Sequence, residues 1–330
     1  MKVFPDRGVL KDPPGLNSRR FSVIVPTFKR PALLRRCIRA VTELDYPAEC
    51  FEIVIVNDDI VPIDQIVEPF RSRLNLQLLN QKNTGPAQAR NYGAAVSTGE
   101  FLIFLDDDCA PAADWLMQWD RSVSRWPDNA LGGGTRNAVL SNLFSLASQS
   151  LLDYLYLYYN CSSGLQHGRQ PFAASNNFCV PAAGFRKVGG FSPDFPIAAA
   201  EDRDFCDNWL YNGFNIRMAE EAVVYHSHEL SCGSFWRQHF QYGRGAALYH
   251  MKRTVRRGSQ LKIEPFAFYG GLVLFPFRSE GVARACALSC LLILAQLANM
   301  AGFIAGMYGE SSRRHVSRPP AAPTRSTMSG

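Results

Sequence analysis

The chain has 330 residues, of which 47% are hydrophobic and 19% are charged, and its formal net charge is +6. This composition excludes a disordered chain and predicts one large globular α/β domain, alone or with an appendage, leaning towards membrane contact. The nine cysteines form no Cys-x-x-Cys pair, and the first residues contain no apolar segment typical of a secretory signal. We therefore expect reduced cysteines and a cytoplasmic compartment.

The first predicted strand covers 21–27 and leads into a helix. Residues 1–20 are rich in proline, glycine and charge, so we expect a disordered arm. The strand is β-branched, and the apolar residues after it recur at helical spacing. Two further strands are predicted at 51–56 and 74–79, and a glycine–proline turn then begins a helix that carries Arg90.

A run of five apolar residues at 101–105 predicts a strand buried on both faces of a parallel sheet. Asp106, Asp107 and Asp108 follow it directly. Adjacent carboxylates repel one another and cannot be buried unpaired. A solvated turn would explain them, but so would a divalent-cation site, because hard cations prefer carboxylate oxygens and also bind substrate phosphates.

Strands alternating with helices predict a doubly wound, mostly parallel sheet. Three of the four strands end in polar clusters at one sheet edge, which predicts a nucleotide pocket. The glycine loops of dehydrogenases and of Walker-type proteins are absent, so acids, Arg90 and a metal are expected to hold the nucleotide. Gly132 to Gly134 are expected in a turn, or in a strand that another backbone approaches closely.

The second half of the chain offers further candidates. A helix is predicted at 141–159, followed by a polar loop that could close over a substrate. Glu201 and Asp202 begin another helix. Their negative charges either interact favourably with the helix dipole or supply a general base. His226 and His228 share one face of a strand and are either structural or metal ligands. The local sequence leaves these alternatives open.

Together, these motifs resemble the family 2 glycosyltransferases, which have the GT-A fold, over residues 21–250. The chain departs from the family pattern at Asp59-Ile60, where a glycine–serine pair is common. It lacks the Gln-x-x-Arg-Trp motif of processive members, so the resemblance is to the non-processive type. The matching pieces, in chain order, are Val25-Pro26-Thr27-Phe28, Ile55-Val56-Asn57-Asp58, Gly85-Pro86-Ala87 with Ala89-Arg90-Asn91, Leu105-Asp106-Asp107-Asp108, Val188-Gly189-Gly190-Phe191, Glu201-Asp202 and Tyr225-His226.

The resemblance implies a nucleotide-binding half and an acceptor half. Pro26 and Thr27 are expected to line the base and ribose, and Asp58 to meet the base. Arg90 is expected near the base and diphosphate, and Asp106 on the nucleotide side of the metal.

The resemblance also implies a metal site and a base. Asp106 and Asp108 match the outer residues of the Asp-x-Asp motif, with Asp108 as the direct ligand of Mg²⁺ or Mn²⁺ and Asp107 dispensable. His226 completes the metal site, with His228 as the alternative ligand. Asp202 matches the catalytic base.

The activity so implied is inverting transfer of a sugar from a nucleotide diphosphate sugar to a hydroxyl of a glycan or lipid-linked glycan, as in polysaccharide biosynthesis. Two alternatives are a nucleotidyltransferase and a non-catalytic sugar-nucleotide-binding membrane scaffold. The first would need a loop rich in glycine and arginine after the first strand. The second is disfavoured because the acids and the histidine are all present.

The end of the chain is basic and apolar. Two uncharged stretches, 265–277 and 285–309, follow a cluster of cations, and the second is long enough to span a bilayer. This pattern favours anionic lipid headgroups over nucleic acid and places the chain at the cytoplasmic face of the membrane, although the second stretch could also lie in the interface or be a buried core helix. The cations are Lys252, Arg253, Arg256, Arg257 and Lys262.

The expected domains therefore follow the chain in four segments. A flexible arm covers 1–20, and the catalytic domain covers 21–250. A membrane-associating helical region covers 251–310, and a disordered tail covers 311–330.

Overall fold

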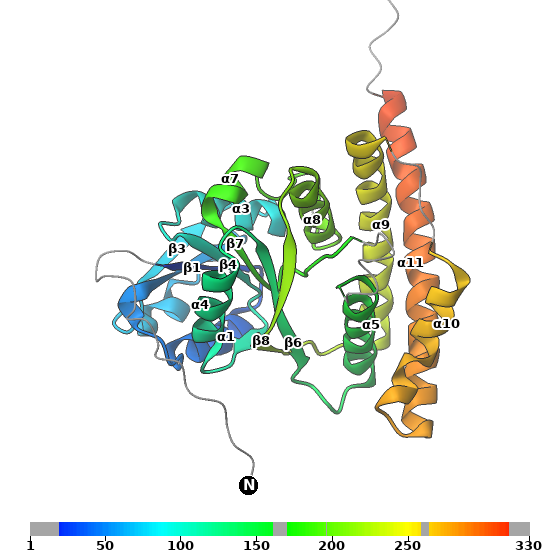
Figure 1. The fold of residues 1–330 in the computed structure, drawn as a ribbon, viewed down its shortest axis with the longest axis horizontal. Helices are drawn as coiled ribbons and strands as arrows, with labels where there is room; N and C mark the ends of the chain where they lie inside the picture. Colours follow the sequence, from blue (N-terminus) through cyan, green and yellow to red (C-terminus); the bar gives the residue numbers. More distant parts are fainter. Residues whose placement is uncertain (1–19, 161–169, 196, 259–263, 317–330) are drawn as a thin grey trace, which may run out of the picture.

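The computed structural model describes residues 20–160, 170–195, 197–258 and 264–316 (Figure 1). The expected arm, apart from Arg20, most of the polar loop after the 141–159 helix, Lys262 and residues 317–330 lie outside this part. The centre is a mixed sheet of eight strands in the order β3-β2-β1-β4-β7-β6-β8-β5. The strands are β1 Phe21–Thr27, β2 Phe51–Asn57, β3 Leu76–Asn80, β4 Phe101–Leu105, β5 Cys109–Pro111, β6 Ala130–Asn137, β7 Asn177–Pro181 and β8 Ile216–His226.

The four strands from β3 to β4 are parallel, which confirms the predicted nucleotide-binding half. β7 then pairs antiparallel with β4, and β6 and β8 pair parallel with each other. A register shift separates Gly133 from Gly134 in β6, and the Asn177 side chain lies where a Cβ of Gly133 would stand. These glycines therefore lie in a strand that another segment approaches closely, as expected.

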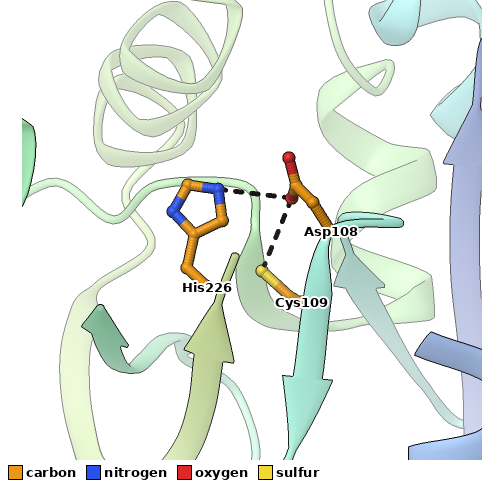
Figure 2. Close-up of side chains that lie close together, drawn as sticks. All are labelled: Asp108, Cys109 and His226. Carbon is orange, nitrogen blue, oxygen red and sulfur yellow. Dashed lines mark hydrogen bonds and ion pairs between the residues drawn. The ribbon is translucent and has the colours of Figure 1, made fainter. Parts of the chain in front are cut away.

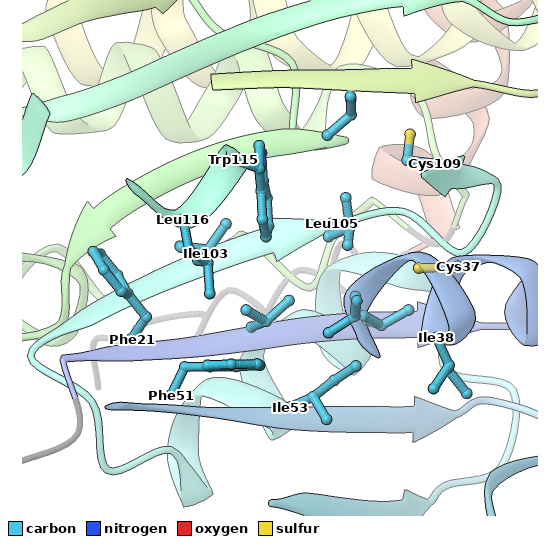
Figure 3. Close-up of a cluster of buried hydrophobic side chains, with 14 of the residues drawn as sticks. Phe21, Cys37, Ile38, Phe51, Ile53, Ile103, Leu105, Cys109, Trp115 and Leu116 are labelled. Carbon is cyan, nitrogen blue, oxygen red and sulfur yellow. The ribbon is translucent and has the colours of Figure 1, made fainter. Parts of the chain in front are cut away.

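Helices cover both faces of the sheet because alternate strand residues point to opposite sides. Val23 and Val25 pack with α1 Pro31–Thr42 and α4 Trp115–Arg125, in the core that Figure 3 shows. Ile24 packs in the opposite core, with α3 and α8. The other helices beside the sheet are α2 Asp64–Val67, α3 Pro86–Val96, α7 Ala182–Val188 and α8 Glu201–Tyr211, with short 3₁₀ turns η1 Ala48–Cys50 and η2 Glu68–Phe70.

A separate helical layer lies beside the sheet (Figure 1). α9 and α11 run side by side, and Gly243 and Gly302 lie where each backbone meets the other helix. α11 continues to Val316, past the boundary expected at residue 310. The layer consists of α5 Leu143–Asn160, α9 Cys232–Arg257, α10 Phe266–Leu274, η3 Phe275–Arg278 and α11 Val282–Val316.

By length and composition, α11 is the one helix of the described residues that could cross a membrane. Within its stretch Val282–Tyr308, an 18-residue segment has a mean hydropathy of 1.9, and one third of that segment is buried. The core helix of a soluble protein can have the same length and composition.

The four cations of the basic cluster that the structure describes form ion pairs within the chain. Arg256 binds Asp204 at 2.8 Å and Asp207 at 2.5 Å, and Arg257 binds Asp207 at 2.8 Å. Lys252 lies 2.5 Å from Asp194. These ion pairs join α9 to α8 and to the segment before it, so the cluster no longer argues for binding to anionic lipid.

Candidate active site

Asp107 is the most buried residue of the aspartate triplet. It has no exposed surface, accepts a hydrogen bond of 2.6 Å from Thr27 Oγ1 and lies 2.6 Å from Arg30 Nη2. Burial raises its pKa to about 7, although Arg30 opposes the shift. Asp107 therefore ties the end of β4 to the end of β1, and its dispensability for the reaction stays a prediction.

Asp108 lies against His226, as Figure 2 shows. β5 and β8 pair antiparallel with Cys109 opposite His226, which brings His226 Nε2 to 3.2 Å from Asp108 Oδ1. The other carboxylate oxygen accepts a hydrogen bond of 2.7 Å from Arg30. Burial raises the pKa of Asp108, but the hydrogen bond and the charge of His226 outweigh burial and hold this pKa below its usual range. Burial lowers the pKa of His226, but the hydrogen bond and the charge of Asp108 outweigh burial and raise this pKa above its usual value.

This pair fits a divalent metal. One ligand atom each from Asp108, Cys109 and His226 lies within 4.8 Å of the others. A carboxylate oxygen and an imidazole nitrogen suit ions such as Mn²⁺, and the buried thiol lies beside them. His228 is outside this group, although its ring centroid is 5.0 Å from that of His226. Burial and the neighbouring His226 lower the pKa of His228 to about 4.

Asp106 and Glu201 share one cation. Arg90, which is 2% exposed, binds Asp106 Oδ1 at 2.8 Å and Glu201 Oε1 at 3.0 Å. Burial and the charge of Asp202 raise the pKa of Glu201 to about 7, against the effect of Arg90. Arg90 thus joins the end of β4 to the start of α8. Asp106 is therefore bound to Arg90 and is not part of the group formed by Asp108, Cys109 and His226.

Asp202 lies in the first turn of α8. The preceding Ala200 has φ 68°, a left-handed backbone that is costly for a residue other than glycine and that sets the start of this helix. Asp202 Oδ1 accepts a hydrogen bond of 2.7 Å from the Arg203 amide. Burial raises the pKa of Asp202, as suits a general base.

Asp58 orders the turn that begins α3. Its Oδ1 accepts hydrogen bonds of 2.8 Å from the Gln81 side chain and the Thr84 amide, and its Oδ2 accepts one of 2.8 Å from the Gly85 amide. Gly85 has φ 94°, which glycine adopts readily. Asp58 therefore fixes the helix that carries Arg90.

A cavity of about 760 Å³ lies between the sheet and the helical layer. Asp106, Asp202 and His226 all line it, together with side chains from α5, α9, α10 and α11. Arg90 and His228 are also on its surface, whereas Pro26, Thr27 and Asp58 are not. The structure thus brings the predicted base, Asp202, and two of the three predicted metal ligands, Asp106 and His226, to one cavity, whereas Asp108 does not line it.

Comparison with known families agrees with this geometry. The model described as "Glycosyl transferase family 2" matches residues 22–179, and "Glycosyl transferase family group 2" matches residues 103–308, more than half of the chain. The chain is a family 2 glycosyltransferase. This membership favours the glycosyltransferase over the nucleotidyltransferase and scaffold alternatives.

Relatives of this glycosyltransferase carry the same class name. Glycosyltransferase AglE of Haloferax volcanii is 32% identical over 115 residues, 34% of this chain and 38% of AglE. The pre-mycofactocin glycosyltransferase of Mycobacterium tuberculosis is 24% identical over 246 residues, 72% of this chain and 49% of that protein. The chain thus spans less than half the length of these two relatives.

Solved structures show that the glycosyltransferase has the GT-A fold. Mannosyltransferase PcManGT from Pyrobaculum calidifontis, in complex with GDP-Man and Mn²⁺, superposes with a TM-score of 0.60 at 17% identity, covering 86% of this chain and 87% of that one. Residues 1–349 of Staphylococcus aureus TarS, in complex with UDP-GlcNAc, give a TM-score of 0.51 at 19% identity, covering 90% and 92%.

One site residue of the glycosyltransferase, Arg30, and one contact, that of Glu201 with Arg90, were missed from the sequence. Arg30 binds both Asp107 and Asp108, and Glu201 binds Arg90. Arg30 could have been found, because buried carboxylates need a cation and it follows a strand that ends at the same sheet edge. Glu201 had no such signal, since its partner lies 111 residues away.

Proposed function

We propose that this glycosyltransferase moves a sugar from a nucleotide diphosphate sugar to an acceptor hydroxyl, with inversion, and that Asp202 is the general base. The observation that carries the proposal is that Asp202, Asp106 and His226 line one cavity. Nucleotide sugars bound to two proteins of the same fold support the choice of donor.

The reaction is a single displacement. The acceptor oxygen forms a bond to the anomeric carbon while the bond from that carbon to the diphosphate oxygen breaks. The acceptor proton passes to the Asp202 carboxylate, and the electron pair leaves with the nucleoside diphosphate. The raised pKa of Asp202 makes its carboxylate a stronger base than an exposed aspartate. No covalent intermediate on the protein is needed.

Asp108 and His226 would hold Mg²⁺ or Mn²⁺, with Asp106 on the nucleotide side. When bound there, the metal supplies positive charge that stabilises the leaving diphosphate. Arg30 holds Asp108 in place, and Arg90 holds Asp106.

Pro26, Thr27 and Asp58 are proposed to line the nucleotide base and ribose. They lie at the carboxyl ends of β1 and β2, the usual place for a nucleotide in a parallel sheet. Location at the cytoplasmic face of the membrane remains part of the proposal and rests on the apolar stretch of α11.

A donor panel tests this function. The full chain is incubated with UDP-, GDP-, ADP- and dTDP-sugars, with methyl and decyl β-D-glucopyranoside offered as acceptors and with Mn²⁺, Mg²⁺ or EDTA, and the release of free nucleoside diphosphate is measured. We expect release from one nucleotide class, lost in EDTA. Release that persists undiminished without metal would refute the metal assignment, and no release from any donor would refute the activity.

A further inference from the structure

The cavity at the active site is lined by two different kinds of side chain. Near the proposed chemistry the lining is charged, with Asp106, Asp202 and His226. In the helical layer, apolar side chains from α5, α10 and α11 stand beside polar ones, many of which come from α9. The apolar residues include Leu151, Leu155, Phe268, Leu297, Met300 and Phe303.

This cavity extends away from the proposed nucleotide site. Pro26, Thr27 and Asp58, at the ends of β1 and β2, do not contribute to its lining. The helices that do contribute stand on the other side of the reaction centre, beside β6 and β8 (Figure 1). The cavity is therefore on the acceptor side of the active site.

We propose that the acceptor is amphipathic, with its reacting hydroxyl at Asp202 and a hydrocarbon chain among the apolar side chains of α5, α10 and α11. This inference rests on the proposed function and names the class of its acceptor. The apolar side chains of α5, α10 and α11 offer a sugar no hydrogen bonds, whereas burial of a hydrocarbon chain among them is favourable.

A buried histidine marks a place for a polar group of the acceptor. His239 lines the cavity, is 1% exposed, and neither ring nitrogen has a hydrogen-bond partner within the described part of the chain. Its ring packs 4.4 Å from Phe235 and 5.6 Å from Tyr242, measured between centroids. An unpaired buried imidazole is costly, and a neutral one can both donate to and accept from a ligand hydroxyl.

The outer face of α11 provides an approach for the hydrocarbon chain. Leu297 and Met300 line the cavity and are nevertheless 48% and 56% exposed. Ile293 and Ile304 continue the same exposed face at helical spacing. The apolar wall of the cavity is therefore continuous with an exposed apolar surface, as a site that takes its acceptor from a lipid phase requires.

Binding of two alkyl glucosides to the full chain tests the proposal. Decyl and methyl β-D-glucopyranoside, below the micellar concentration, are compared by isothermal titration calorimetry. Burial of each methylene strengthens binding roughly fourfold, so we expect the decyl compound to bind at least about 30-fold more tightly. Equal affinity for the two compounds would overturn the proposal.

A matched pair of variants on α9 locates the bound chain. Ala246 lines the cavity, and Ala246→Trp should fill it and weaken decyl glucoside binding by about tenfold or more. Val255 is 83% exposed on the same helix and outside the cavity, so Val255→Trp should leave the affinity within about twofold. Unchanged binding by Ala246→Trp would place the chain on the outer face of α11 and overturn the proposal.

A second pair on α11 covers the case in which Ala246→Trp fails to fold. Met300→Glu puts a charge into the apolar wall and should weaken decyl glucoside binding, whereas Met307→Glu, at a 40% exposed position outside the cavity, should not. Equal effects of the two would overturn the proposal. The release of nucleoside diphosphate is a separate readout. Its absence with every sugar nucleotide refutes the proposed function. Release together with equal affinity for the decyl and methyl glucosides refutes only this inference.

Discussion

Arg90 donates a hydrogen bond of 2.8 Å to Asp106, the first residue after β4. Its other terminal nitrogen lies 3.0 Å from Glu201, the residue before Asp202. One buried guanidinium therefore fixes the distance between the aspartate triplet and the proposed base. Because a general base must lie within hydrogen-bond reach of its proton, this link sets the geometry of the reaction.

Loss of this guanidinium should destabilise the fold. Arg90→Gln leaves the buried Glu201 and the partly buried Asp106 without their cation, and loss of one partner of a buried ion pair typically costs about 3–5 kcal/mol. We expect a decrease of that size in the free energy of unfolding in urea. Arg136→Gln, an exposed position on β6, is the control and should change stability by about 0.5 kcal/mol or less. Equal effects of the two substitutions would show that the bridge does not stabilise the fold.

Asp107 should make stability depend on pH. Its pKa is about 7 in the folded chain and about 3.9 when unfolded, so between these values the folded state binds more protons. Its contribution to stability therefore grows as the pH falls from 8 to 5. Asp107→Asn removes the titration, so the wild type should gain stability relative to the variant over that range. A difference in urea unfolding that is constant from pH 8 to pH 5 would contradict the assignment.

Metal binding should depend on Asp108 and His226. Asp108→Asn and His226→Gln each remove one proposed ligand and should weaken Mn²⁺ binding by roughly tenfold or more, since loss of an outer-sphere partner alone typically costs that much. Free Mn²⁺ is measured by electron paramagnetic resonance. His228→Gln is the matched control, and a loss as large as that of His226→Gln would make His228 a ligand.

The exposed face of α11 should govern association with membranes. Ile293 and Ile304, 46% and 50% exposed, lie on one face of this helix together with Leu297 and Met300. The double substitution Ile293→Glu and Ile304→Glu places two carboxylates on that face and should move the protein to the soluble fraction in carbonate extraction. Wild-type chain found wholly in the soluble fraction would contradict membrane association.

The sequence was sufficient to predict the nucleotide-binding half. The run at 101–105 is apolar throughout, and the run at 51–56 is apolar except for Glu52. A parallel strand that helices cover on both faces shows no regular polar alternation. Each run ends in acids, and parallel strands end at the same edge. The position of Asp106 and Asp108 at the sheet edge follows from these two facts.

The rest of the fold and of the site depends on contacts between residues that are distant in the sequence. β5 has three residues and β6 contains three consecutive glycines, so neither shows the alternation that predicts a strand. The cluster on α9 was interpreted as lipid-binding because its partners, Asp204 and Asp207, lie about 50 residues away on α8. Such pairing is set by helix packing and leaves no local signal.

The most direct test of the proposed mechanism is nucleoside diphosphate release by Asp202→Asn, with the donor identified by the panel and the affinity for that donor measured in parallel. Asp128→Asn, at an exposed position between α4 and β6, is the matched control. A positioned base typically contributes about 10²- to 10⁴-fold, so we predict a loss of that size in release with donor affinity nearly unchanged. Full turnover by Asp202→Asn would contradict the account.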